Sequence, residues 1–104
     1  MPSHVHLICG LYSETLPEFL RGHSEEVSLI HVDCDLYSST AIVFQSLSNR
    51  VTSGCIIVFD EYFNYPGWRH HEFKAFQELV SDQSLHYHYD SFVPSHQQVC
   101  VVID

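Results

Sequence analysis

The stretch SLIHVDCDLYSST, residues 28–40, decides the fold class of this chain. It begins with an almost continuous apolar run, as expected of a strand covered on both faces of a sheet. The run ends in two aspartates, Asp33 and Asp35, which are followed by small hydroxyl residues. Ser38 or Ser39 can cap a helix that runs to about Arg50, so the stretch predicts a strand, a short acidic loop and a helix.

A second apolar strand, predicted over residues 55–59 (CIIVF), also ends in acids, Asp60 and Glu61. We expect Ser53-Gly54 to stop the preceding helix. Two strands joined by a right-handed crossover can lie side by side, about 4.8 Å apart. Their terminal carboxylates are therefore expected to converge at one edge of the sheet, where ligands bind in open α/β sheets.

The rest of the chain extends the same alternation. Strands are predicted over residues 5–9 (ending at Gly10), 85–89 and 99–103, and helices over 15–20 and 69–81, the latter with Phe73, Phe76, Leu79 and Val80 inward. An aromatic loop, residues 62–68, precedes the last helix. This order predicts an α/β fold with a mostly parallel sheet, an antiparallel final pair of strands and helices on both faces.

Length and charge narrow the classes of partner. The 104 residues are enough for one domain with a hydrophobic core. The formal net charge is −9, from 13 acidic and 4 basic residues, which argues against nucleic acid and anionic membranes as partners. No apolar run approaches the roughly 20 residues of a membrane span, and no secretory signal is visible at the N-terminus.

The four cysteines, Cys9, Cys34, Cys55 and Cys100, are widely spaced inside apolar runs and form no C-x-x-C pair. They are expected to be reduced, buried thiols of a cytoplasmic protein.

The residue types present allow two kinds of metal site. Two His-x-His pairs, His4/His6 and His86/His88, could chelate zinc if they lie in strands, although neither has a third ligand nearby. Asp33, Asp60 and Glu61 offer hard oxygen ligands, which suit Mg²⁺ better than zinc. The alternative is that these acids merely cap the helices that follow the strands.

Three enzyme classes place Asp-x-Asp at the end of a buried strand. Haloacid-dehalogenase-like phosphatases also need a later lysine, but the single lysine here, Lys74, lies inside a predicted helix after the second acidic pair. Nucleotide-sugar glycosyltransferases need a nucleotide site, for which no motif is present. Metal-dependent methyl transfer is the third class.

The motifs CGLYSETLPEFL (9–20), HVDCDLYSST (31–40), GCIIVFDEYFNYPGW (54–68) and HHEFKAF (70–76) occur in one order. Together they resemble the C-terminal half of class I S-adenosylmethionine-dependent methyltransferases, most closely the macrocin-type sugar O-methyltransferases. The resemblance extends from about residue 5 to 103.

This resemblance implies site residues and cofactors. Asp33, Asp60 and Glu61 fall where the family places its Mg²⁺-binding acids, and Asp33 would also be the catalytic base for the hydroxyl of a small-molecule or sugar acceptor. Gly10 and Leu11 fall near the adenine of S-adenosylmethionine. Asp35 is expected to hold the loop and cap the next helix. Glu61 replaces the usual second Asp or Asn and has a longer reach.

The resemblance also implies a partial domain. The glycine-rich cofactor loop belongs to the family's first two strands, neither of which is present in residues 1–104. The family's strand order is 3-2-1-4-5-7-6, so we expect a 4-5-7-6 sheet, with residues 5–9 displaced or inserted beside the first of these strands. A non-catalytic metal-binding or interaction module, one half of a split enzyme and a homodimer formed through exposed apolar surface remain alternatives.

Overall fold

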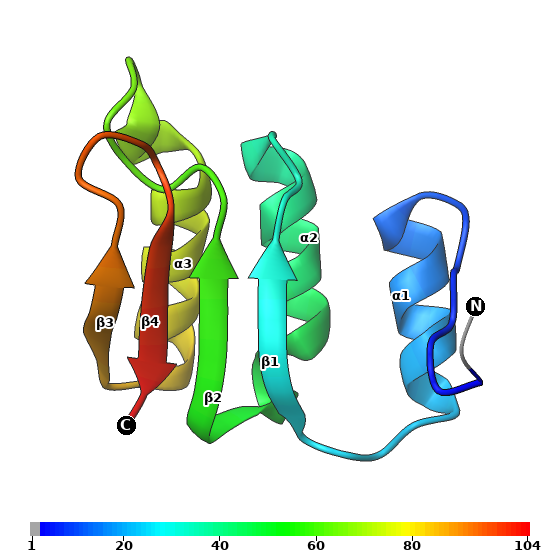
Figure 1. The fold of residues 1–104 in the computed structure, drawn as a ribbon. Coiled ribbons are helices and arrows are strands. Elements are labelled where there is room, and N and C mark those ends of the chain that lie inside the picture. Colours follow the sequence, from blue (N-terminus) through cyan, green and yellow to red (C-terminus); the bar gives the residue numbers. More distant parts are fainter. Residues whose placement is uncertain (1–2) are drawn as a thin grey trace.

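The computed structural model describes residues 3–104, which form a four-stranded mixed sheet in the order β1-β2-β4-β3 (Figure 1). The strands are β1 (Val27–Val32), β2 (Val51–Phe59), β3 (Tyr87–Phe92) and β4 (Val99–Ile103). β1 and β2 are parallel, whereas β4 runs antiparallel to both of its neighbours. The α/β class and the expected 4-5-7-6 order are therefore confirmed.

Three helices accompany this sheet: two cover one of its faces, and the first lies beyond the edge of β1 (Figure 1). They are α1 (Tyr12–Arg21), α2 (Tyr37–Leu47) and α3 (Glu72–Gln83); two 3₁₀ turns, η1 (Ser48–Arg50) and η2 (Trp68–His70), precede β2 and α3. Alternate strand residues are buried against the helices, while Leu29 and Ile56 on the other face are 60% and 38% exposed. The expectation of helices on both faces is thus not met in residues 3–104. None of these helices is long and apolar enough to cross a bilayer.

The core is built on three phenylalanines from three elements. Phe59 of β2 packs edge-on against Phe76 of α3, with ring centroids 5.2 Å apart, and Phe44 of α2 lies 6.0 Å from Phe59. All three rings are at most 2% exposed. Since a buried phenylalanine contributes about 1.5–3 kcal/mol through burial alone, this cluster fixes both helices on the sheet.

Residues 5–9 do not form the predicted strand. They are irregular and lie beside α1 (Figure 1), and their apolar side chains remain exposed, Leu7 by 77%. A strand forms only where its backbone groups find a partner, and β1 pairs on one side only, with β2. Residues 5–9 are apolar enough for a strand, but they are displaced and do not pair with the other edge of β1.

Several boundaries also differ from prediction. α2 begins after Leu36, which makes no side-chain cap, so neither Ser38 nor Ser39 caps the helix. β2 begins at Val51, and Gly54, with φ +90°, lies inside that strand instead of ending the helix. The helix ends through the 3₁₀ turn η1.

All four cysteines are free thiols. Cys55 is buried, and its burial raises the pKa of its thiol. Cys9 is exposed, contrary to expectation, because its segment lies outside the sheet.

Arg50 connects the end of helix α1 to the rest of the fold. The helix has no buried residue, although Leu16 and Leu20 pack partly against the core. The Arg50 guanidinium donates hydrogen bonds to the carbonyls of His23 and Leu20, the latter at 2.9 Å. One planar side chain therefore holds the end of α1 against η1.

Replacing Arg50 by lysine should loosen α1, because a single ammonium group does not reproduce the guanidinium fork. We expect amide hydrogens of residues 12–21 to exchange about 5 to 30 times faster, equivalent to about 1–2 kcal/mol, with β2 unaffected. Hydrogen exchange followed by mass spectrometry measures this. Arg21→Lys on α1 itself is the matched control, and equal effects of both variants would contradict the role of Arg50.

Candidate active site at the carboxyl edge of the sheet

The parallel pairing of β1 and β2 places two acids side by side. Val32 and Phe59, the last residues of the two strands, are paired, and the Asp60 N–H donates to the Val32 carbonyl at 3.0 Å. Asp33 and Asp60 therefore leave adjacent strands at the same level. The sequence-predicted acids are brought to one edge of the sheet.

The charges of these groups act on each other. The negative charge of Asp60 is the largest cause that raises the pKa of Asp33, followed by desolvation and the charge of Asp35. Burial is the largest cause that raises the pKa of Glu61, followed by Asp35 and then by Asp60 and Asp33. Four carboxyl groups thus share this edge, and each additional negative charge there is costly.

Asp35 has a different local role from the one expected. Its φ of +65° lies in the left-handed region, which aspartate tolerates better than most residues. The Leu36 N–H then donates to the Cys34 carbonyl at 2.8 Å, closing a tight turn before α2. Asp35 does not cap the helix; it turns the loop so that its carboxyl group faces Glu61.

A fifth carboxyl group, Glu72, was missed from the sequence. It is 1% exposed, and its Oε1 accepts a hydrogen bond from the Glu61 N–H at 3.0 Å, while its Oε2 has no partner. Burial is the main cause that raises the pKa of Glu72 to about 7. The available signal was its helical spacing with Phe76 and Leu79, which places it on the inward face of α3.

Gly10 and Leu11 line a shallow pocket of about 190 Å³ between the start of α1 and α2. Gly10 has φ +139°, and a Cβ there would lie 2.6 Å from Thr15 Cγ2, so only glycine fits. The next residue, Tyr12, has its pKa raised, first by the charge of Cys34 and also by Asp33 and Asp35. The pocket therefore adjoins the acidic loop.

No three or more His, Cys, Asp or Glu side chains within residues 3–104 are arranged as a metal site. The zinc alternative finds no support: His4 lies in a turn and His6 in an irregular segment, and His88 is engaged with Asp104 at 2.7 Å. For Mg²⁺ the donor chemistry is suitable, since hard oxygens crowd together and one buried oxygen, Glu72 Oε2, is unpartnered. Coordination distances are not preformed.

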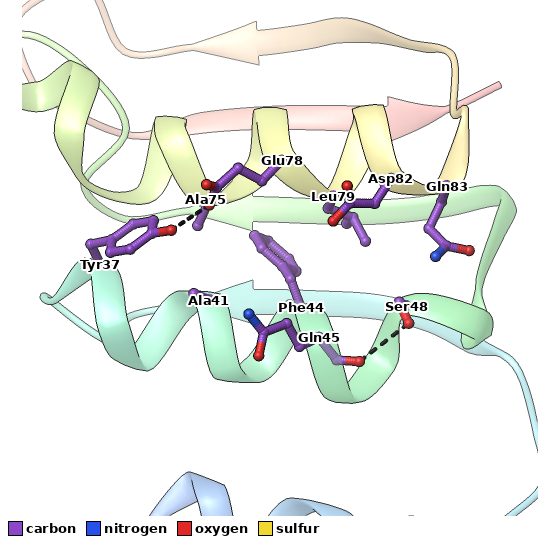
Figure 2. Close-up of a pocket in the computed structure, with 10 residues that line it drawn as sticks. All are labelled: Tyr37, Ala41, Phe44, Gln45, Ser48, Ala75, Glu78, Leu79, Asp82 and Gln83. Carbon is purple, nitrogen blue, oxygen red and sulfur yellow. Dashed lines mark hydrogen bonds between the residues drawn. The ribbon is translucent and has the colours of Figure 1, made fainter.

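A larger cavity lies elsewhere, in a groove of about 300 Å³ between α2 and α3 (Figure 2). The Tyr37 hydroxyl donates to Glu78 Oε1 at 2.5 Å across it, and the Lys74 ammonium lies 4.4 Å from the centre of the Tyr37 ring. None of the sequence-predicted site residues lines this groove. The volume of a cavity therefore does not identify the functional site. The carboxyl edge of the sheet is the better candidate, because its carboxyl groups lie close together.

Glu72→Gln should change how stability depends on pH. The raised pKa means that folded Glu72 holds a proton between about pH 4.5 and 7 that unfolded Glu72 has lost, so the free energy of unfolding of the original chain falls as pH rises through this window. Glutamine does not titrate and still accepts the Glu61 N–H. We expect the variant to be more stable than the original chain by roughly 1–3 kcal/mol at pH 8. This difference should become smaller at pH 5.

Urea unfolding in EDTA at both pH values measures this difference. Glu18→Gln, at an exposed position of α1, is the control. A stability difference for Glu72→Gln that does not change between pH 5 and 8 would contradict the assignment.

Comparison with known proteins supports the fold class and identifies a family. A family model described as macrocin-O-methyltransferase (TylF) matches residues 1–86. No curated protein matches the chain.

Two solved structures are similar over 95% of this chain, each with 26% sequence identity and a TM-score of 0.71. One is the apo form of CalS11, described as a TDP-rhamnose 3'-O-methyltransferase in calicheamicin biosynthesis, and the other is CalS11 described as calicheamicin methyltransferase. The chain spans 43% and 39% of their lengths. On the family match, which covers most of its length, this chain belongs to the macrocin-O-methyltransferase (TylF) family.

Proposed function

We propose that this chain supplies the acceptor and metal side of an S-adenosylmethionine-dependent O-methyltransferase that acts on a sugar hydroxyl. The observation that carries the proposal is the meeting of Asp33 and Asp60 at the ends of adjacent parallel strands, with Glu61 beside them. Family membership supports methyl transfer as the reaction and excludes the phosphatase alternative from further consideration. CalS11, named for a TDP-rhamnose acceptor, supports a sugar as the substrate class.

Asp33 is proposed as the catalytic base. It is exposed at the edge, so its carboxylate is accessible to the hydroxyl of an acceptor. Asp33 takes the proton of the acceptor hydroxyl. S-adenosylmethionine, when bound, would supply the methyl group that replaces this proton on the acceptor oxygen.

Asp33, Asp60 and Glu61 are proposed to hold Mg²⁺. When bound, the ion lowers the pKa of the acceptor hydroxyl and orients it. The support from this chain is the excess of negative charge at this edge, where the pKa values of Asp33, Glu61 and Glu72 are all raised. Glu72 is proposed to position Glu61, because it fixes the Glu61 backbone through a hydrogen bond.

The pocket at Gly10 and Leu11 is proposed for the adenine of S-adenosylmethionine. Ser39 and Ile42 of α2 complete its wall, and the absence of a side chain at Gly10 leaves the backbone accessible. Tyr12 links this pocket to the acidic loop, so a cofactor there would lie beside Asp33.

A second candidate function is a non-catalytic half that associates with a partner or with a second copy. The open sheet face favours it, because Leu29 and Ile56 are exposed there and β1 has a free edge. Such a chain would bind Mg²⁺ without binding the cofactor, or would dimerise without turnover. A cytoplasmic location is proposed with either function.

Isothermal titration with Mg²⁺ and with S-adenosylmethionine tests the proposal. We expect saturable binding of Mg²⁺, weakened at least about tenfold in Asp60→Asn because a ligand charge is lost. Asp82→Asn on α3, a carboxylate of the α2–α3 groove, is the matched control and should bind normally.

Methyl transfer to TDP-rhamnose, detected by mass spectrometry, tests the reaction itself. We expect Asp33→Asn to lower the rate by about 10²- to 10⁴-fold, since it removes the base. Binding of Mg²⁺ without the cofactor would favour the second candidate function. If neither ligand binds, the site assignment is wrong.

A further inference from the structure

An aromatic pocket of about 250 Å³ lies beside the acidic edge. Its walls come from the loop after β2, from the start of α3 and from β3, and they include Tyr62, Phe63, Trp68, Phe73, Tyr89 and Phe92. Tyr62 and Phe63 directly follow Asp60 and Glu61 in the chain. The pocket and the acids are therefore held by the same loop.

The walls of this pocket consist of aromatic rings that pack against one another. Trp68 and Phe73 pack edge to face with centroids 5.0 Å apart, and Phe63 and Phe92 do so at 6.0 Å. Tyr62 is 4% exposed and packs on Phe59 of the core, whereas Phe92 is 59% exposed at the rim. A cavity of about 150 Å³ accommodates benzene, so this pocket has room for one or two planar rings.

Hydrogen bonds behind the wall fix the orientation of its tyrosine rings. The Tyr62 and Tyr89 hydroxyls are 2.8 Å apart, and the Tyr87 and Tyr89 hydroxyls are 3.3 Å apart. Gln77 Nε2 donates to Tyr62 at 3.4 Å and to Tyr87 at 3.1 Å. Because these hydroxyls are engaged with one another, Tyr62 and Tyr89 present ring carbons to the pocket, whose lining is almost wholly apolar.

We propose that this pocket binds an uncharged planar ring attached to the acceptor sugar and thereby selects ring-bearing acceptors. Aromatic walls stack such a ring, and the almost wholly apolar lining favours a ring without charge. The inference rests on the proposed function, since the sugar hydroxyl would then lie at the acidic edge. The ring could be an aryl group bonded to the sugar or the base of a nucleotide sugar.

Trp68 is the only tryptophan of the chain, so its fluorescence reports on the pocket directly. We would titrate the chain with 4-nitrophenyl rhamnoside, with thymidine and with rhamnose, correcting for absorption by the probes with free tryptophan. Saturable quenching by either ring-bearing probe is expected, with an affinity at least about tenfold above that of rhamnose, and the quenching probe identifies the source of the ring.

Phe92→Ala should weaken that affinity about five- to tenfold, because it removes a stacking wall at an exposed position where folding tolerates the change. Tyr89→Phe keeps the ring that lines the pocket and removes a hydroxyl that bonds to Tyr62 and Tyr87, so its affinity for the probe should stay close to that of the original chain. Leu29→Ala, an equally exposed apolar residue on the open sheet face, is the matched control.

Absence of quenching by both ring probes, or quenching unchanged in Phe92→Ala, would overturn the inference. These readouts need neither Mg²⁺ nor turnover. Methylation of a sugar without binding of either ring probe would support the proposed function and refute the role of the pocket. Ring binding by a chain that neither binds the cofactor nor methylates would support the pocket and refute the proposed function.

Discussion

The hydrogen bond from the Asp60 N–H to the Val32 carbonyl, 3.0 Å long, extends the β1–β2 ladder by one step beyond the ends of both strands. Because the strands are parallel and end at one level, this bond decides that Asp33 and Asp60 meet. A shift of register by one residue would turn the terminal side chains to opposite faces and separate the two charges. The acidic edge, the turn at Asp35 and the course of the aromatic loop all depend on this alignment.

The crowding of carboxyl groups at that edge has to be tolerated by the fold. Phe44, Phe59 and Phe76 form a tight core immediately below it, and the backbone of Glu61 is held by the buried Glu72. Such a site is less stable than a neutral one of the same shape, which is common where stability is sacrificed for chemistry. The core of aromatic rings supplies the rigidity that keeps the repelling groups together.

The elements that sequence reasoning predicted well are those whose signal is local. β1, β2 and β4 are apolar runs, whereas the order of the sheet was expected from the resemblance to the methyltransferase family. The elements it predicted poorly depend on distant partners. Residues 5–9 have a strand pattern but do not pair with the open edge of β1. Glu72 has the pattern of an ordinary helical acid, and its role depends on the turn at Glu61, which folds back on α3. The one-sided helical layer likewise depends on which segments are present.

The position of β4 bears on how the chain is made. β4 is the last strand in the sequence, yet it lies inside the sheet, between β2 and β3. During synthesis, which proceeds from the N-terminus, β1, α2 and β2 can pair and pack as soon as they leave the ribosome. β3 has no neighbour until residues 99–103 emerge, so completion of the sheet must wait for the final strand. A released chain that ended before Val99 would therefore have both the β2 edge and β3 unpaired, a state prone to aggregation.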